Sequence, residues 1–179
     1  MENVLEFPAA LATADEPSGT PLVRAAQRGD PAAFDALYAQ YARVVHGILL
    51  ARVPRQETQD LVQDVFLQAW RNLHTLRDAR AFPGWVAMIA RNRATDWHRR
   101  APLTVEVTER TAVQPPTPPE AVQVLETIRS LPEAYRETLL LRLVEGMSGP
   151  EIAERTGLTH DSVRVNLHRG MKMLREKLS

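Results

Sequence analysis

The stretch SGPEIAERTGLTHDSVRVNLHRGMKMLREKLS, residues 148–179, predicts two helices joined by a tight turn. Ser148 and Glu151 form an S-x-x-E capping box, in which the serine hydroxyl accepts from a helical N–H and the glutamate reaches back to the serine N–H. Gly157 suits the left-handed conformation that ends many helices, and Thr159 can cap the helix that follows.

The second helix of this pair has an apolar face and a basic face. Its apolar residues recur at helical spacing: Val163, Leu167, Met171, Leu174 and Leu178. Its opposite face carries Arg164, His168, Lys172 and Arg175. A helix that presents basic groups outward after a Gly-containing turn is typical of a helix-turn-helix, whose second helix enters the major groove of DNA. An ordinary helical hairpin with a solvated basic face is the alternative.

The net charge of zero hides an uneven distribution. The 179 residues include 22 basic and 22 acidic side chains. Residues 1–20 hold four acids and no base, whereas residues 21–100 hold twelve bases and seven acids. Residues 160–178 hold five bases and two acids. Positive charge is therefore concentrated on two segments, as nucleic-acid binding requires.

Composition also argues against several classes of protein. The absence of cysteine excludes disulfides and cysteine-ligated zinc and suits the cytoplasm. The five histidines have no metal-binding spacing, and no phosphate loop or nucleophile elbow occurs, so we expect neither enzymatic activity nor a metal or cofactor. No apolar run has the length of a membrane span, and Glu2 and Glu6 replace the basic start of a signal peptide. We expect a soluble cytoplasmic protein without membrane insertion.

The N-terminal half predicts a helical bundle after a flexible tail, residues 1–22. Asp30 is placed to cap a helix that begins at Pro31. The apolar stripe of this helix is Phe34, Leu37, Tyr38, Tyr41, Val45 and Ile48. A second helix, from Thr58 to Leu73, has two adjacent apolar rows and a polar row that contains Asp60, Gln63, Asp64 and Gln68. The polar row indicates either a solvated side or a face that contacts a partner protein.

A basic segment closes this half of the chain. Residues 74–84 predict a loop, and a helix is expected from Trp85 to Arg100 with arginines along it. Bases interleaved with aromatic rings suit unstacked single-stranded nucleic acid, because rings stack on bases and guanidinium groups bind phosphate. Alternatively, Trp85 and Trp97 belong to the core and the arginines only solubilise the helix.

Residues 102–119 contain five prolines and little periodicity, which indicates a linker. Fully extended, it could span about 60 Å. Residues 120–179 predict four helices, the last two being the helix-turn-helix. Ser130–Glu133 repeats the S-x-P-E pattern at a helix start, with Tyr135, Leu139, Leu140 and Leu143 expected inward. The predicted fold is all-α, with one helical domain at residues 23–101 and another at residues 120–179.

Two parts of the chain resemble the sigma-70 family. DLVQDVFLQAW at residues 60–70 and FxxWVxxIARNxxxDxxRR at residues 82–100 resemble region 2. LPExYRxxLLL at residues 131–141, with EIAE at 151–154 and VRxxLHR at 163–169, resembles region 4. Both regions in this order around a short linker resemble the extracytoplasmic-function (ECF) group.

The resemblance implies an alternative sigma factor, which would bind core RNA polymerase, recognise duplex −35 DNA and melted −10 DNA, and pair with an anti-sigma factor. The residues implied in polymerase binding are Asp60, Gln63, Asp64, Leu67 and Gln68. Those implied in −10 binding are Leu73, Arg77, Arg80, Phe82, Arg91, Asn92, Arg99 and Arg100. Those implied in −35 binding are Thr159, Arg164, Val165, His168, Arg169 and Lys172.

Departures from the family pattern leave the promoter sequence open. Val165 and Asn166 stand where the family often has a small polar residue and a base, and valine can contact a thymine methyl but cannot hydrogen-bond a base. Asp64 replaces a commoner glutamate. Two rival hypotheses are a sigma mimic that titrates an anti-sigma factor and a helix-turn-helix repressor whose N-terminal bundle dimerises or binds a ligand.

Overall fold

The computed structural model describes residues 19–100 and 119–178, and the regular structure in these ranges is entirely helical, as expected. The first group, here the N-terminal unit, comprises α1 Thr20–Gln27, α2 Pro31–Leu50, α3 Arg55–Asn72, the 3-10 turns η1 Leu73–Thr75 and η2 Ala79–Ala81, and α4 Phe82–Arg100. The second, the C-terminal unit, comprises α5 Pro119–Arg129, α6 Glu133–Leu143, α7 Gly149–Thr156 and α8 His160–Leu178. Most of the expected tail and linker lies outside the described residues, and α1 begins within the last residues of the expected tail.

The capping signals at Asp30, Ser148 and Gly157 are confirmed. The Asp30 carboxylate accepts from the N–H groups of Ala32 and Ala33 at the start of α2. The capping box of Ser148 and Glu151 starts α7, and Gly157 ends that helix with φ of 74°. These local groups satisfy the backbone polar atoms that helix ends leave unpaired.

The second S-x-P-E pattern behaves differently. Ser130 does not cap α6; its hydroxyl donates instead to the Thr127 carbonyl in the last turn of α5, at 2.7 Å, and Pro132 precedes α6 without a side-chain cap. The inward face of α6 is also rotated from the expected one, because Leu143 is 45% exposed whereas Leu141 is fully buried. The prediction for Leu143 was therefore wrong. Leu141 is buried because it packs on α2 of the other unit.

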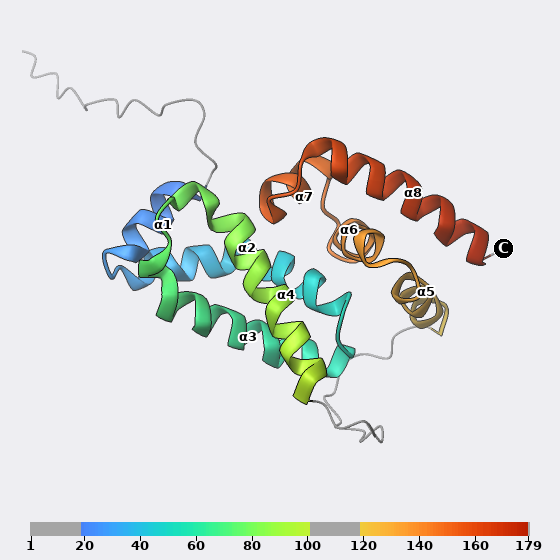
Figure 1. Ribbon diagram of the computed structural model, residues 1–179, viewed down its shortest axis with the longest axis horizontal. Coiled ribbons are helices and arrows are strands. Elements are labelled where there is room, and N and C mark those ends of the chain that lie inside the picture. The colour runs from blue at the N-terminus through green and yellow to red at the C-terminus, as the bar shows by residue number, and fades with distance from the viewer. Residues whose placement is uncertain (1–18, 101–118, 179) are drawn as a thin grey trace, which may run out of the picture.

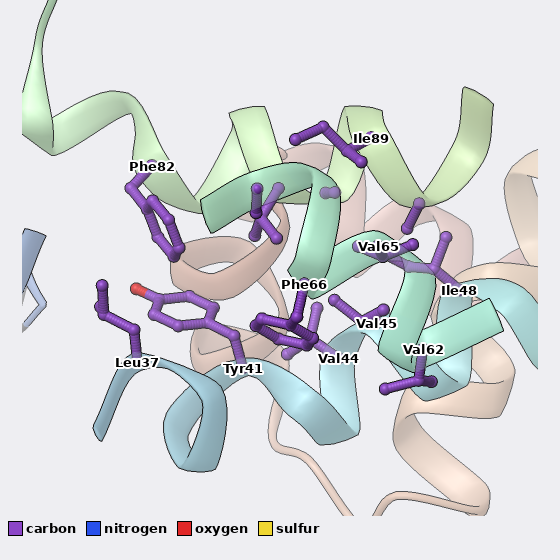
Figure 2. Close-up of a cluster of buried hydrophobic side chains, with 14 of the residues drawn as sticks. Leu37, Tyr41, Val44, Val45, Ile48, Val62, Val65, Phe66, Phe82 and Ile89 are labelled. Atoms are coloured by element: carbon purple, nitrogen blue, oxygen red, sulfur yellow. The ribbon is translucent and has the colours of Figure 1, made fainter. Parts of the chain in front are cut away.

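The core of the N-terminal unit lies between α2, α3 and α4. Figure 2 shows side chains from these three helices meeting in one layer, among them Ile48, Val65 and Ile89. Tyr41 lies fully inside this layer, edge-on to the Phe82 ring at 5.1 Å between centroids. Burial raises the pKa of Tyr41 to about 12, so its hydroxyl stays neutral.

The two units pack directly against each other. Figure 1 shows α6 and α7 beside the N-terminal unit, and Leu141, Ile152 and Val163 join its buried cluster. In return, Leu50 and Ala51 at the end of α2 join the cluster of the C-terminal unit. The linker pattern predicts two separable modules but carries no sign of this contact, which covers part of the N-terminal unit.

Candidate nucleic-acid interface

Helix α8 presents the basic face predicted for a recognition helix. Leu174 is buried in the cluster of the C-terminal unit, and Val163 is buried in the cluster shared with the N-terminal unit. Leu167 and Met171 are half-buried. Leu178, expected on the same inner stripe, is 43% exposed because the last turn extends beyond its packing partners. Thr159 caps the helix: its hydroxyl oxygen accepts from the Ser162 N–H at 3.1 Å.

The remaining residues predicted for −35 binding share one exposed surface of α8: Arg164, Val165, His168, Arg169 and Lys172. Arg164 pairs with Asp161 at 3.2 Å, but both side chains are more than three-quarters exposed, so the pair costs little to break. Val165 is 39% exposed. The surface therefore offers the Arg164 guanidinium near the start of the helix, further cations at Arg169 and Lys172, and an apolar contact that suits a thymine methyl.

Helix α3 carries the residues predicted for polymerase binding. Asp60, Gln63 and Leu67 are exposed, while Asp64 and Gln68 are half-buried. Asp64 lies 3.5 Å from Arg93 of α4. Beside this row, α2 and α3 form an open apolar groove lined by Pro31, Phe34, Asp35, Tyr38, Gln63, Phe66, Leu67 and Trp70. Leu67 and Trp70 are 54% and 40% exposed, which is unusual for apolar residues of this size.

The residues predicted for −10 binding divide into a supporting group and a surface group. Leu73 and Phe82 are 2% and 0% exposed and belong to the core, so in this conformation they support the loop between α3 and α4 and do not reach DNA. Arg77 and Arg80 project from that loop and are exposed. Asp78 binds the Arg80 backbone and side chain, which lowers the pKa of the carboxyl group.

Gln27 of α1 fixes the same loop and was not singled out in the sequence. Its amide donates to the carbonyl oxygens of Leu73 and Leu76 at 3.1 and 2.7 Å, and thereby ties α1 to the start of this loop. No motif marks this residue, because the contact joins positions more than forty residues apart.

Helix α4 carries the other predicted −10 residues. Asn92, Arg99 and Arg100 are exposed, and Arg99 lies 3.8 Å from Asp96. Arg91 is different: its guanidinium binds Glu137 of α6 through two hydrogen bonds, at 2.7 and 3.1 Å. Glu137 is a second residue that sequence reasoning missed.

Both interpretations of the tryptophans contain part of the answer. Trp85 and Trp97 are half-buried and pack against the core of the N-terminal unit, so each ring has a structural role and an accessible part. Among the described residues, no three His, Cys, Asp or Glu side chains are grouped as a metal site requires. None of the described helices combines the length and apolar character needed to cross a membrane.

The comparisons agree with this geometry. A family model described as sigma-70 region 2 matches residues 37–102, and one described as sigma-70 region 4 matches residues 121–174. The chain is 31% identical to the ECF RNA polymerase sigma-E factor of Haemophilus influenzae, with 88% of this chain and 93% of the relative covered. It is also 31% identical to the factor of the same name from Escherichia coli K12, with 88% and 92% covered.

A solved structure resembles the whole described fold. The complex of CnrH with the cytosolic domain of CnrY contains a chain that superimposes with a TM-score of 0.63 at 27% identity. The match covers 89% of this chain and 96% of that chain. The likeness therefore extends over both helical units.

Proposed function

The chain belongs to the ECF group of sigma-70 factors and is an alternative sigma factor, and we propose that it directs core RNA polymerase to promoters through three surfaces. The observation that carries this proposal is that one chain holds region 2 and region 4 in order, with an exposed basic recognition helix in the second. The proposal assigns the chain no catalytic role, since polymerase supplies the chemistry, and a cytoplasmic location beside polymerase.

The first surface is the recognition helix α8. In the proposal, Arg164 and His168 read base edges of the −35 duplex, Val165 contacts a thymine methyl, and Arg169 and Lys172 bind phosphates. The exposure of these five side chains on one face supports this division. Thr159 positions the N-terminus of the helix, where base-reading residues lie in a helix-turn-helix.

The second surface lies on the loop between α3 and α4 and along α4. Arg77, Arg80, Arg99 and Arg100 supply exposed cations for the phosphates of a melted −10 strand. Stabilising bases outside the stack offsets the cost of unstacking, which is a few kcal/mol per base. Binding of open DNA thus drives promoter melting.

The third surface is the polar row of α3 with the adjoining apolar groove, which we propose binds core polymerase. Exposed Leu67 and Trp70 supply apolar anchors, and Asp60 and Gln63 supply a polar rim. We also propose an anti-sigma partner, which the resemblance to CnrH in its complex with the cytosolic domain of CnrY supports.

Paired aspartate substitutions test the third surface. Leu67→Asp places a charge among apolar contacts and is expected to weaken binding to purified core polymerase by about tenfold or more. Val122→Asp is the control, since Val122 is comparably exposed on α5, outside the predicted surface. Equal polymerase binding by the two variants in a titrated pull-down would remove α3 from the proposed interface.

A further inference from the structure

Glu137 is a buried acidic residue at the boundary between the units. It lies on α6, is 4% exposed, and accepts from Arg91 Nε and Nη2 of α4. Arg52 Nη2 lies 2.8 Å from Glu137 Oε2, so two guanidinium groups of the N-terminal unit meet one carboxylate of the C-terminal unit. A second ionic contact between the units lies apart from it, where Glu145, just after α6, faces Arg43 and His46 of α2.

The carboxylate is charged in this setting. Burial alone raises the pKa of Glu137, but the hydrogen bonds from Arg91 and the charge of Arg52 outweigh burial, so the pKa lies below its ordinary value. A buried charge with good partners is costly to leave unpaired. Glu137 therefore favours the packed arrangement as long as both arginines face it.

Glu137 takes the Nε/Nη2 edge of the Arg91 guanidinium. The paired donors of this edge match a carboxylate and a phosphate equally, because both present two oxygens to the planar fork. In the packed arrangement that fork is held by Glu137 in a part-buried contact. A DNA phosphate and Glu137 cannot both occupy it.

Apolar and backbone contacts extend the interface beyond this pair. A Cβ atom added at Gly47 of α2 would lie 2.6 Å from Leu141 Cδ2, so α6 packs almost onto the α2 backbone. Arg129 of α5 donates to the carbonyls of Leu50 and Val53 at the end of α2. These contacts hold α6 over Arg91.

The start of α4 is covered as well. Gly157 at the end of α7 packs against Gly84, where a Cβ at Gly157 would lie 2.9 Å from the Gly84 Cα. A hollow beside this contact is lined by Arg80 and Trp85 of the N-terminal unit and by Glu154 of α7. The packed C-terminal unit thus lies along the surface proposed for −10 DNA.

We propose that the C-terminal unit is an internal competitor for single-stranded DNA, in which Glu137 occupies the Arg91 guanidinium that would otherwise bind a backbone phosphate. The inference rests on the proposed function, since it takes α4 as part of the −10 surface. The free chain is closed, and −10 DNA gains access to Arg91 only when the two units separate.

Two substitutions open the interface by unrelated means. Glu137→Gln removes the charge that binds the arginines. Gly47→Leu adds a side chain that clashes with Leu141 and changes no charge. Glu120→Gln, at an exposed position of α5, is the control for loss of one negative charge. Circular dichroism establishes that each variant keeps its helical content.

Opening is measured by distance and by DNA binding. Because the chain has no cysteine, spin labels can be placed at Gln59→Cys and Gln123→Cys, both exposed positions in different units. We expect one short distance distribution for the wild-type chain and the Glu120→Gln control, and a longer, broader one for both opening variants. A random-sequence single-stranded 20-mer serves as the DNA probe.

The salt dependence of binding identifies the group released. Opening adds a phosphate contact at Arg91, so both variants should bind the probe more tightly, with a slope of log K against log salt steeper by about 0.7. Adding Arg91→Gln to Gly47→Leu should cancel that gain. The proposal would be overturned if the spin labels showed a long distance in the wild-type chain or a short one in both variants. Unchanged binding of the probe by the variants would also overturn it, as would a gain in binding that survives Arg91→Gln.

These measurements use neither polymerase nor a promoter, so they test the internal competition independently of the proposed function. A wild-type chain without promoter-specific transcription, but with the expected opening and salt slopes, would contradict the proposed function alone. If the wild-type chain initiated transcription but Glu137→Gln and Gly47→Leu bound the probe no more tightly than wild type, only the internal competition would be contradicted.

Discussion

At the scale of single residues, the proposed roles in base reading and phosphate binding fall at different positions along α8. Arg164 lies in the first turns of α8 with 79% of its side chain exposed, and its partner Asp161 is equally open to solvent. A guanidinium in that position can make two hydrogen bonds to a guanine edge. In the proposal, residues farther along α8, such as Lys172, bind the DNA backbone.

Arg164→Ala is therefore expected to weaken −35 recognition by about 1–3 kcal/mol and to relax selectivity at one base pair. Lys172→Ala is the comparison, because loss of a phosphate contact weakens all sequences alike and lowers the salt slope by about one. Binding of polymerase complexes to a promoter library measures both effects. Unchanged promoter selection in Arg164→Ala would reject the role given to that residue.

At the scale of helices, local sequence predicts most helix ends, but it misses one local alternative and the side chains whose partners are distant. Asp30, Ser148 and Gly157 act on backbone groups within a few residues, so their patterns suffice. Ser130 stands in the same pattern as Ser148 but donates back into α5. Glu137 and Gln27 also escape prediction, since their partners lie 46 or more residues away.

The two serines give a matched test of capping. Ser148→Ala removes the acceptor for the Glu151 N–H and is expected to lower the free energy of unfolding by about 1 kcal/mol. Ser130→Ala should change it by less than about 0.5 kcal/mol, because the exposed hydroxyl caps no helix start. Urea titrations followed by circular dichroism compare them. Equal losses would mean that the capping box contributes nothing particular to α7.

At the scale of the whole molecule, the sequence predicts two helical units but not how they meet. A proline-rich segment of about 18 residues permits both contact and wide separation, and its composition favours neither. In the described structure the units are in contact, and Leu141 and Glu137 of α6 are buried between them. The sequence pattern of α6 does not indicate that these two side chains are buried. The proposed surfaces for DNA and polymerase follow from motifs, whereas the accessibility of Arg91 depends on this packing.

Acid should weaken the contact between the units. The folded-state pKa of Glu137 lies below its ordinary value of 4.5, so its stabilisation is fully present above pH 4.5 and is lost as pH falls through the folded-state value. The difference in unfolding free energy between wild type and Glu137→Gln should therefore shrink below pH 4.5. Denaturant titrations across that range measure it, and a difference that is constant with pH would show that Glu137 carries no charge in the folded chain.

Reconstitution with purified core polymerase and a pool of genomic promoters measures sigma activity most directly. The account predicts promoter-specific transcripts that share −35 and −10 elements and that disappear when the chain is omitted. If the chain bound duplex DNA tightly but conferred no promoter selectivity on polymerase, the sigma assignment would be contradicted and a repressor would fit better.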